Sequence, residues 1–294
     1  MKTFGKNILE TIGNTPLIEI GGIWAKLETT NPTGSIKDRM AWNIIRRAEE
    51  RGELREGMEI LEVTSGNTGI SFSMLSAIRG YGLTAVMPES MSIMRRRMIE
   101  KFGGKIVLTP AEKDMAGAIA EYERLVALHP DWYLPNQFKN PDNPDAHYRG
   151  TAEEILEQMP GKIGAFVAGA GTGGTLIGTG RRLKEEFPDI RIVAVEPMES
   201  AVLSGKQPGH HEIQGIGEGF IPELLQRNLD LVDEIIAIPG VDAISMADKL
   251  AKEHGILVGT SSGANYLAAQ KLKEKNGEVV TIFPDRGERY LSDL

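Results

Sequence analysis

Apolar runs of strand length alternate with amphipathic helical patterns along most of the chain, and this alternation constrains the fold most strongly. It is typical of parallel sheets that carry helices on both faces. We therefore predict an α/β fold with strands at 24–28, 59–63, 84–87, 105–108, 165–168, 190–195 and 279–283. The predicted helices cover 38–51, 69–79, 92–102, 113–128, 151–158, 176–187, 243–254 and 264–273.

Length and charge narrow the class of protein. The chain has 294 residues, enough for two lobes, and its net charge of −8 does not favour a nucleic-acid backbone. It has no cysteine, which excludes disulfides, thiolate metal sites and a cysteine nucleophile, and its five histidines lack a metal-binding spacing. We see no signal peptide and no apolar stretch of about 20 residues, so we expect a cytoplasmic protein that binds no metal, membrane or nucleic acid.

Two stretches interrupt the regular pattern. The turn-rich segment from Asn140 to Asp145 is either a lobe boundary or a surface loop. The segment from Glu199 to Pro222 is long for a simple connection, and such loops are often functional.

The first chemically suggestive loop runs from Asn31 to Arg39. Ser35 is placed to cap the following helix, so Lys37 falls in the first helical turn. The positive end of a helix lowers the pKa of an amine, which favours a nucleophilic or Schiff-base lysine. A solvated lysine is the alternative, since lysines are mostly exposed.

Two further loops each join a strand to a helix. The loop from Thr64 to Gly69 offers hydroxyls, an amide and free N–H groups that suit a carboxylate, although a capping turn uses the same residues. The glycine-rich loop from Gly169 to Thr175 lets backbone N–H groups approach a phosphate, whereas tight packing alone is the weaker explanation.

Two motifs in these regions are ambiguous. Gly169, Gly171 and Gly174 fit G-x-G-x-x-G, and Glu196 follows at nearly the spacing of a ribose-binding acid, so a nucleotide-dependent oxidoreductase competes. Ser261 fits G-x-S-x-G, but every histidine precedes it, which excludes the hydrolase order of that motif.

Taken in order, these loops resemble the cysteine synthase (O-acetylserine sulfhydrylase) family of pyridoxal-5′-phosphate enzymes, fold type II. The resemblance covers nearly the whole chain. The motifs that carry it are TIGNTPL from Thr11, NPTGSIKDR from Asn31, TSGNTG from Thr64, MPESMS from Met87, GTGGT from Gly171, IQGIGEGF from Ile213 and GERYLS from Gly287.

The resemblance implies a role for each matching residue. Lys37 would hold the cofactor as a Schiff base and move the substrate's α-proton, and Asn67 would bond the cofactor's phenolic oxygen. The cofactor phosphate would lie against Gly171, Thr172, Gly173, Gly174 and Thr175. Ser261, with Ser262 as the alternative, would face the pyridine nitrogen. The substrate carboxylate would be held by Thr64, Ser65, Thr68 and Gln137, with Gly215 bordering the pocket.

The resemblance also implies an activity, a transferase-type β-replacement that turns O-acetylserine and sulfide into cysteine and acetate. It implies two lobes, each with a mainly parallel sheet: residues 38–140 as the smaller mobile lobe, and 1–37 with 141–294 as the larger. It further implies a homodimer and a possible complex with the C-terminus of serine acetyltransferase. Cystathionine β-synthase and serine or threonine dehydratase remain alternatives of the same fold. Glu218 departs from many relatives, which have a small residue there, and we expect it near the entrance.

Overall fold

The larger of two sheets has six strands. The computed structural model describes residues 6–64 and 66–293. All strands of this sheet run parallel except the first, which pairs antiparallel with the second. Their order across the sheet is β1 (Leu17–Ile20), β2 (Ile23–Leu27), β9 (Val279–Phe283), β6 (Ala165–Gly169), β7 (Arg191–Pro197) and β8 (Glu234–Ile238).

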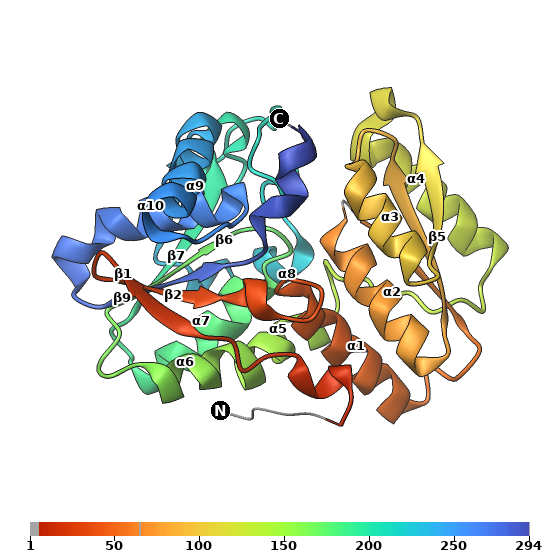
Figure 1. Ribbon diagram of the computed structural model, residues 1–294, viewed down its shortest axis with the longest axis horizontal. Coiled ribbons are helices and arrows are strands. Elements are labelled where there is room, and N and C mark those ends of the chain that lie inside the picture. The colour runs from red at the N-terminus through yellow and green to blue at the C-terminus, as the bar shows by residue number, and fades with distance from the viewer. Residues whose placement is uncertain (1–5, 65, 294) are drawn as a thin grey trace.

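The smaller sheet has three parallel strands, β3 (Glu59–Val63), β4 (Gly82–Pro88) and β5 (Lys105–Thr109). Its helices are α2 (Asn67–Arg79), α3 (Ile93–Lys101) and α4 (Asp114–Leu128). Figure 1 shows these elements, in orange and yellow, as a body on the right beside the larger sheet and its helices. Two lobes with mainly parallel sheets, flanked by helices, are therefore confirmed.

Helices cover both faces of the larger sheet, as strand–helix alternation requires. Because successive strand residues point to opposite faces, neighbouring residues of β6 join different cores. Val167 packs with residues of α9 (Gly240–His254) and α10 (Thr260–Asn276), whereas Phe166 packs with residues of α7 (Gly174–Glu186) and α6 (Ala152–Gln158).

Helix α1 (Lys37–Arg51) lies between the two bodies and packs on both (Figure 1). Ile44 and Ile45 are fully buried in the core of the smaller sheet. On another side of the helix, the Asn43 amide donates to the Asp142 carbonyl at 2.7 Å. The proposed boundary at residues 37 and 38 falls at the start of this shared helix, and it stays a prediction.

The turn-rich segment is not a surface loop, so that alternative is wrong. It contains the short helix α5 (Asp142–Ala146), followed by a π-helical turn over His147–Thr151. Asn140 accepts a hydrogen bond from the Asp142 N–H group and so stabilises the start, where Pro144 is also tolerated. Asn143 is buried, because it packs against α7.

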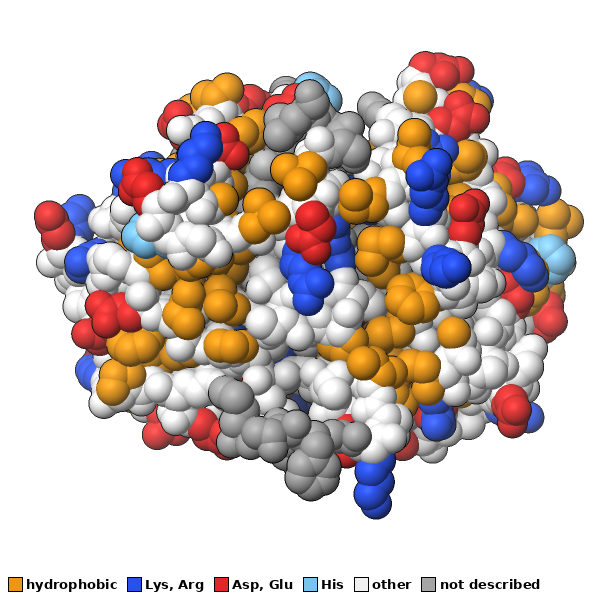
Figure 2. Space-filling view, in the orientation of Figure 1, with side chains coloured by type: hydrophobic (Ala, Val, Ile, Leu, Met, Phe, Trp, Pro, Cys, Tyr) orange, Lys and Arg blue, Asp and Glu red, His pale blue; other side chains and the backbone are white. Residues whose placement is uncertain are grey.

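The surface in Figure 2 intersperses acidic and basic side chains, and hydrophobic side chains gather across its middle. Nucleic-acid binding favours clusters of lysine and arginine. The described residues on this face do not form such a cluster. Among the residues that the structure describes, no helix combines the length and apolar character needed to cross a membrane.

Candidate active site

Loops from both bodies surround one cleft, which encloses about 940 Å³ of empty space, part of it open to solvent. The cleft brings together most of the residues predicted from sequence: Lys37, Thr64, Asn67, Thr68, Gln137, Gly171, Thr172, Gly173, Thr175, Gly215 and Ser261. Gly174 lies beside it as the first residue of α7, and Ser65 lies outside the described residues. Ser262 is buried and is not among the lining residues, so the geometry favours Ser261 over it.

Lys37 is the first residue of α1, one position earlier than the sequence predicted, and it is half-buried. The Ser35 hydroxyl accepts a hydrogen bond from the Lys37 N–H group at 3.2 Å, which is the expected capping contact. Burial lowers the pKa of the Lys37 amine, although Glu218 and Asp285 oppose the shift. Lys37 is therefore not a solvated lysine, and its amine becomes a nucleophile more easily than an exposed one.

The next residue, Asp38, fixes the backbone around Lys37. Its buried carboxylate accepts hydrogen bonds from the N–H group of Thr33, at 2.7 Å, and from the hydroxyl of Ser71, at 2.6 Å. Thr33 belongs to the loop before α1, and Ser71 belongs to α2. One carboxylate thus joins the lysine loop to the helix that follows the predicted carboxylate-binding loop.

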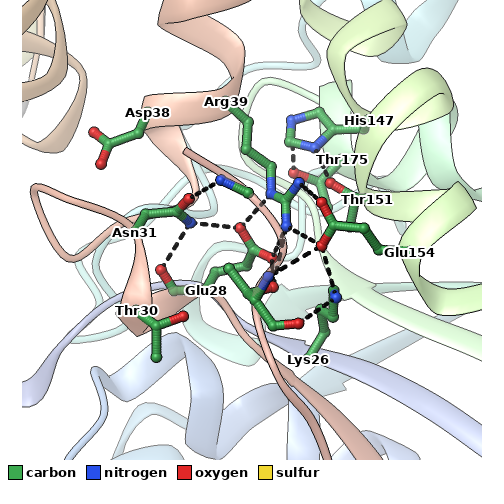
Figure 3. A network of polar contacts seen from close by, with 12 residues as sticks. Lys26, Glu28, Thr30, Asn31, Asp38, Arg39, His147, Thr151, Glu154 and Thr175 are labelled. Carbon is green, nitrogen blue, oxygen red and sulfur yellow. Dashed lines mark hydrogen bonds and ion pairs between the residues drawn. The ribbon is translucent and has the colours of Figure 1, made fainter. Parts of the chain in front are cut away.

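Arg39 fixes the other side of the lysine loop, through the polar network in Figure 3. Its guanidinium group bonds Glu28 at 2.6 Å and Glu154 at 2.6 Å. Lys26, fully buried, also bonds Glu154 at 2.8 Å. Burial alone would raise the pKa of Glu154, but Arg39 and Lys26 outweigh it and lower this pKa to about 2. The network holds α1, β2 and α6 together behind Lys37.

The predicted carboxylate-binding residues form a connected set. The Thr64 hydroxyl accepts hydrogen bonds from Gly66 and Gly69, so the capping alternative holds for this side chain. The Thr68 hydroxyl donates to the side-chain amide oxygen of Gln137 at 3.0 Å, and the side-chain NH₂ group of Gln137 donates to the Glu62 carboxyl at 2.7 Å. Burial raises the pKa of Glu62 to about 8, although the hydrogen bond from Gln137 opposes this shift.

The glycine-rich loop fits a phosphate. Gly173 has a φ of +87°, which favours glycine, and it is the cap residue of α7. A Cβ on Gly171 would lie 2.5 Å from the carbonyl oxygen of Gly215, so only glycine allows these two loops to approach. Backbone N–H groups at the start of a 13-residue helix favour an anion.

Packing also explains part of this glycine pattern. A Cβ on Gly174 would lie 1.8 Å from the Asn143 side chain. The Asn143 amide donates to the Thr172 hydroxyl at 3.0 Å and to the Gln137 carbonyl at 2.8 Å. Packing therefore explains Gly174, and phosphate binding by the rest of the loop stays a prediction.

His147 supports the glycine-rich loop without lining the cleft, and local sequence patterns assigned it no role. It is buried, and its ring nitrogens lie 3.3 Å from the Thr175 hydroxyl and 3.0 Å from the Thr151 hydroxyl (Figure 3). Burial and the positive charges of Arg39 and Lys37 lower its pKa well below the usual value. A neutral imidazole therefore contacts the Thr175 hydroxyl and helps to fix its position.

The chain matches the family model described as "Pyridoxal-phosphate dependent enzyme" over residues 8–285. The chain belongs to this family. A cysteine synthase of Staphylococcus aureus is 47% identical over 97% of this chain and 95% of its own. The solved structure of a cysteine synthase from Entamoeba histolytica is 45% identical, with a TM-score of 0.94, and covers 99% of this chain and 90% of that one.

Solved structures similar to this chain also carry other names. An O-acetylserine-dependent cystathionine β-synthase from Helicobacter pylori is 39% identical, with a TM-score of 0.93, over 99% of this chain and 98% of its own. The backbone alone therefore does not fix the nucleophile that such a cleft accepts.

Membership of this family removes the need for a dinucleotide site, and the geometry agrees. Glu196, the acid that suggested ribose binding, is buried and already engaged. Its carboxylate accepts hydrogen bonds from the N–H groups of Leu203, at 2.8 Å, and Ser204, at 3.2 Å. Glu196 therefore stabilises the backbone at Leu203 and Ser204 and has no free carboxylate oxygen to offer a ribose.

Proposed function

We propose that this protein is a cysteine synthase, which converts O-acetyl-L-serine and sulfide into L-cysteine and acetate. The observation that carries the proposal is the meeting of Lys37, the Thr64–Thr68 loop and the glycine-rich loop in one cleft. The relatives named cysteine synthase, at 45–47% identity over nearly the whole chain, point to the same activity.

Bound pyridoxal phosphate supplies an electron sink at the substrate's α-carbon. Lys37 would hold the cofactor through its amine, and once the substrate's amine has taken that place, the freed Lys37 amine would remove and return the α-proton. Gly173 and its neighbours would hold the phosphate, and the Asn67 amide would bond the phenolic oxygen. The Ser261 hydroxyl would face the pyridine nitrogen, and a neutral partner there would keep the ring a restrained electron sink.

The substrate's carboxylate is bound by the Thr64–Thr68 loop together with Gln137. The hydrogen bond from Thr68 to Gln137 already places two of these groups side by side. Residues 38–140 form the smaller lobe, and capture of the carboxylate closes it over the cleft. Closure excludes water from the reacting carbon, so that sulfide rather than water completes the replacement.

A visible absorption spectrum of the purified protein tests the proposal. We expect a band from bound cofactor that changes when O-acetylserine is added, and cysteine formation when sulfide follows. Oxo-acid formation from serine or threonine alone would favour a dehydratase instead, and cystathionine formation from homocysteine in preference to cysteine would favour a cystathionine β-synthase. A colourless protein that binds NADH would favour the oxidoreductase.

The protein's surroundings are part of the same proposal. We infer a homodimer, which light scattering would detect as twice the mass of the 294-residue chain. We also infer a cytoplasmic location, where the enzyme would meet serine acetyltransferase. That partner's terminal carboxylate would use the same groups as the substrate's carboxylate.

A further inference from the structure

Glu218, which we expect near the entrance, forms part of the wall of the cleft. It lines the same cleft as Lys37 and is half-buried. Its neighbours Gly217 and Gly219 have φ values of +71° and +80°, which favour glycine on both sides. The Gly217 N–H group donates to the Ala170 carbonyl at 3.2 Å, which fixes this turn against the glycine-rich loop.

Two carboxylates line the cleft, and they differ in their partners. Asp285 accepts hydrogen bonds from Asn67, at 2.6 Å, and from Tyr290, at 2.5 Å. Glu218 makes no hydrogen bond or ion pair of its own with any residue in the ranges 6–64 and 66–293. Burial raises the pKa of Glu218, and the nearby amine of Lys37 opposes this shift.

Glu218 shares the cleft with the cation Arg95 and with the carboxylate of Asp285, which is already hydrogen-bonded. The substrate-binding side chains Thr64, Thr68 and Gln137 are neutral, and Lys37 is engaged at the cofactor. A ligand that enters beside Glu218 therefore meets a carboxyl group without a hydrogen-bond partner of its own among the described residues, in a partly desolvated cleft where an electrostatic interaction is stronger than in water. Such a charge discriminates between ligands more than it adds affinity.

We propose that Glu218 selects the incoming nucleophile by its charge, so that neutral and cationic thiols are accepted in preference to anionic ones. This inference rests on the proposed function, because it concerns the second substrate of the same cleft. Glu218 acts on the binding of the nucleophile, and the chemistry remains with Lys37 and the cofactor.

Three thiols of similar size and different charge test the proposal with the holoenzyme and O-acetylserine. They are cysteamine, which is cationic, 2-mercaptoethanol, which is neutral, and mercaptoacetate, which is anionic. In the Glu218→Gln variant, we expect the ratio of kcat/KM for cysteamine to that for mercaptoacetate to fall by about tenfold or more. Such a factor requires only about 1.4 kcal/mol.

The Glu212→Gln variant is the matched control. Glu212 lies in the same irregular stretch and is exposed, and its substitution changes the net charge of the chain equally. We expect this control to leave the ratio at its wild-type value. Glu218→Ala supplies a second variant if the glutamine variant folds poorly.

An unchanged ratio in both Glu218 variants would overturn the proposal. A loss of activity that is equal for all three thiols would also overturn it, because it would make Glu218 a positioning residue for Lys37. The response of the wild-type absorption spectrum to O-acetylserine is recorded separately. Without that response the proposed function itself fails, so the two failures are distinguishable.

Discussion

The side-chain amide of Asn67 donates a hydrogen bond of 2.6 Å to the carboxylate of Asp285, 218 positions further along the chain. Asn67 begins α2 beside the smaller sheet, and Asp285 follows β9 of the larger sheet. The bond therefore joins the two bodies across the cleft. Because Asn67 is also predicted to bond the cofactor, cofactor binding and the contact between the bodies share one side chain.

The Lys37→Ala variant should bind pyridoxal phosphate without a covalent bond and lose turnover by several orders of magnitude, because one amine serves both attachment and proton transfer. Borohydride reduction followed by mass spectrometry measures the covalent attachment. Lys105→Ala, at an exposed lysine, is the control and should keep both properties. Turnover near the wild-type level in Lys37→Ala would show that another group performs the chemistry.

The Gly173→Val variant should bind pyridoxal phosphate more weakly. A side chain at this left-handed residue is strained and meets Leu225 at 3.0 Å, so it displaces the backbone that approaches the phosphate. Gly205→Val is the control, because Gly205 has a similar φ of +79° with open space around it. Fluorescence titration of each apoenzyme with cofactor measures the affinities of the two variants for pyridoxal phosphate. Equal affinities would mean that the phosphate lies elsewhere.

The Arg39→Met variant should lose about 3 to 5 kcal/mol of unfolding free energy, because it leaves the buried charge of Glu28 without its ion-pair partner and removes one of the two cations that pair with Glu154. Arg46→Met, on the same helix, removes an exposed ion pair with Glu50 and should cost under about 1 kcal/mol. Urea denaturation measures both. Similar losses in the two variants would contradict the structural role given to the network.

Glu62 should make stability depend on pH. Its pKa is raised from 4.5 to about 8, so its contribution to stability is present below about pH 4.5 and is lost as the pH rises through about 8. The Glu62→Gln variant should reduce this decline by on the order of 5 kcal/mol, since each pKa unit corresponds to about 1.4 kcal/mol. Urea denaturation across this range, with the exposed Glu112→Gln as control, would show it. A decline of wild-type size in Glu62→Gln would assign it to other groups.

A peptide from the C-terminus of serine acetyltransferase should compete with O-acetylserine, since both present a carboxylate to the Thr64–Thr68 loop and Gln137. The same negative charge at Glu218 that disfavours anionic thiols should weaken this binding. We therefore expect tighter binding of the peptide to Glu218→Gln than to the wild type. Cofactor fluorescence follows the titration, and absence of competition at high peptide concentration would rule the partner out.

Local sequence patterns predicted the buried elements well. The boundaries of β3 and β9 agree with the prediction. The strands β1 and β8 were missed. They are the two edges of the larger sheet, where burial is partial, and both are short, with four and five residues.

Long-range contacts were beyond local patterns. Arg39 and Glu154 are 115 positions apart, and nothing in the sequence around either residue indicates the other. His147 likewise reaches Thr175 only through the packing of the π-helical turn His147–Thr151 against α7. Glu218 was recognised as unusual from the sequence, but its position beside Lys37 depends on how the irregular stretch folds back on the glycine-rich loop.

The buried network behind Lys37 contains two cations, Lys26 and Arg39, and two anions, Glu28 and Glu154, so its formal charges cancel. A change at any one of the four leaves an unbalanced charge in the interior, whereas a matched change at two need not. Evolution is therefore expected to replace these positions in pairs. Related chains should carry either all four charged residues or a paired replacement. Such paired substitutions would show which relatives keep the buried network that supports the lysine.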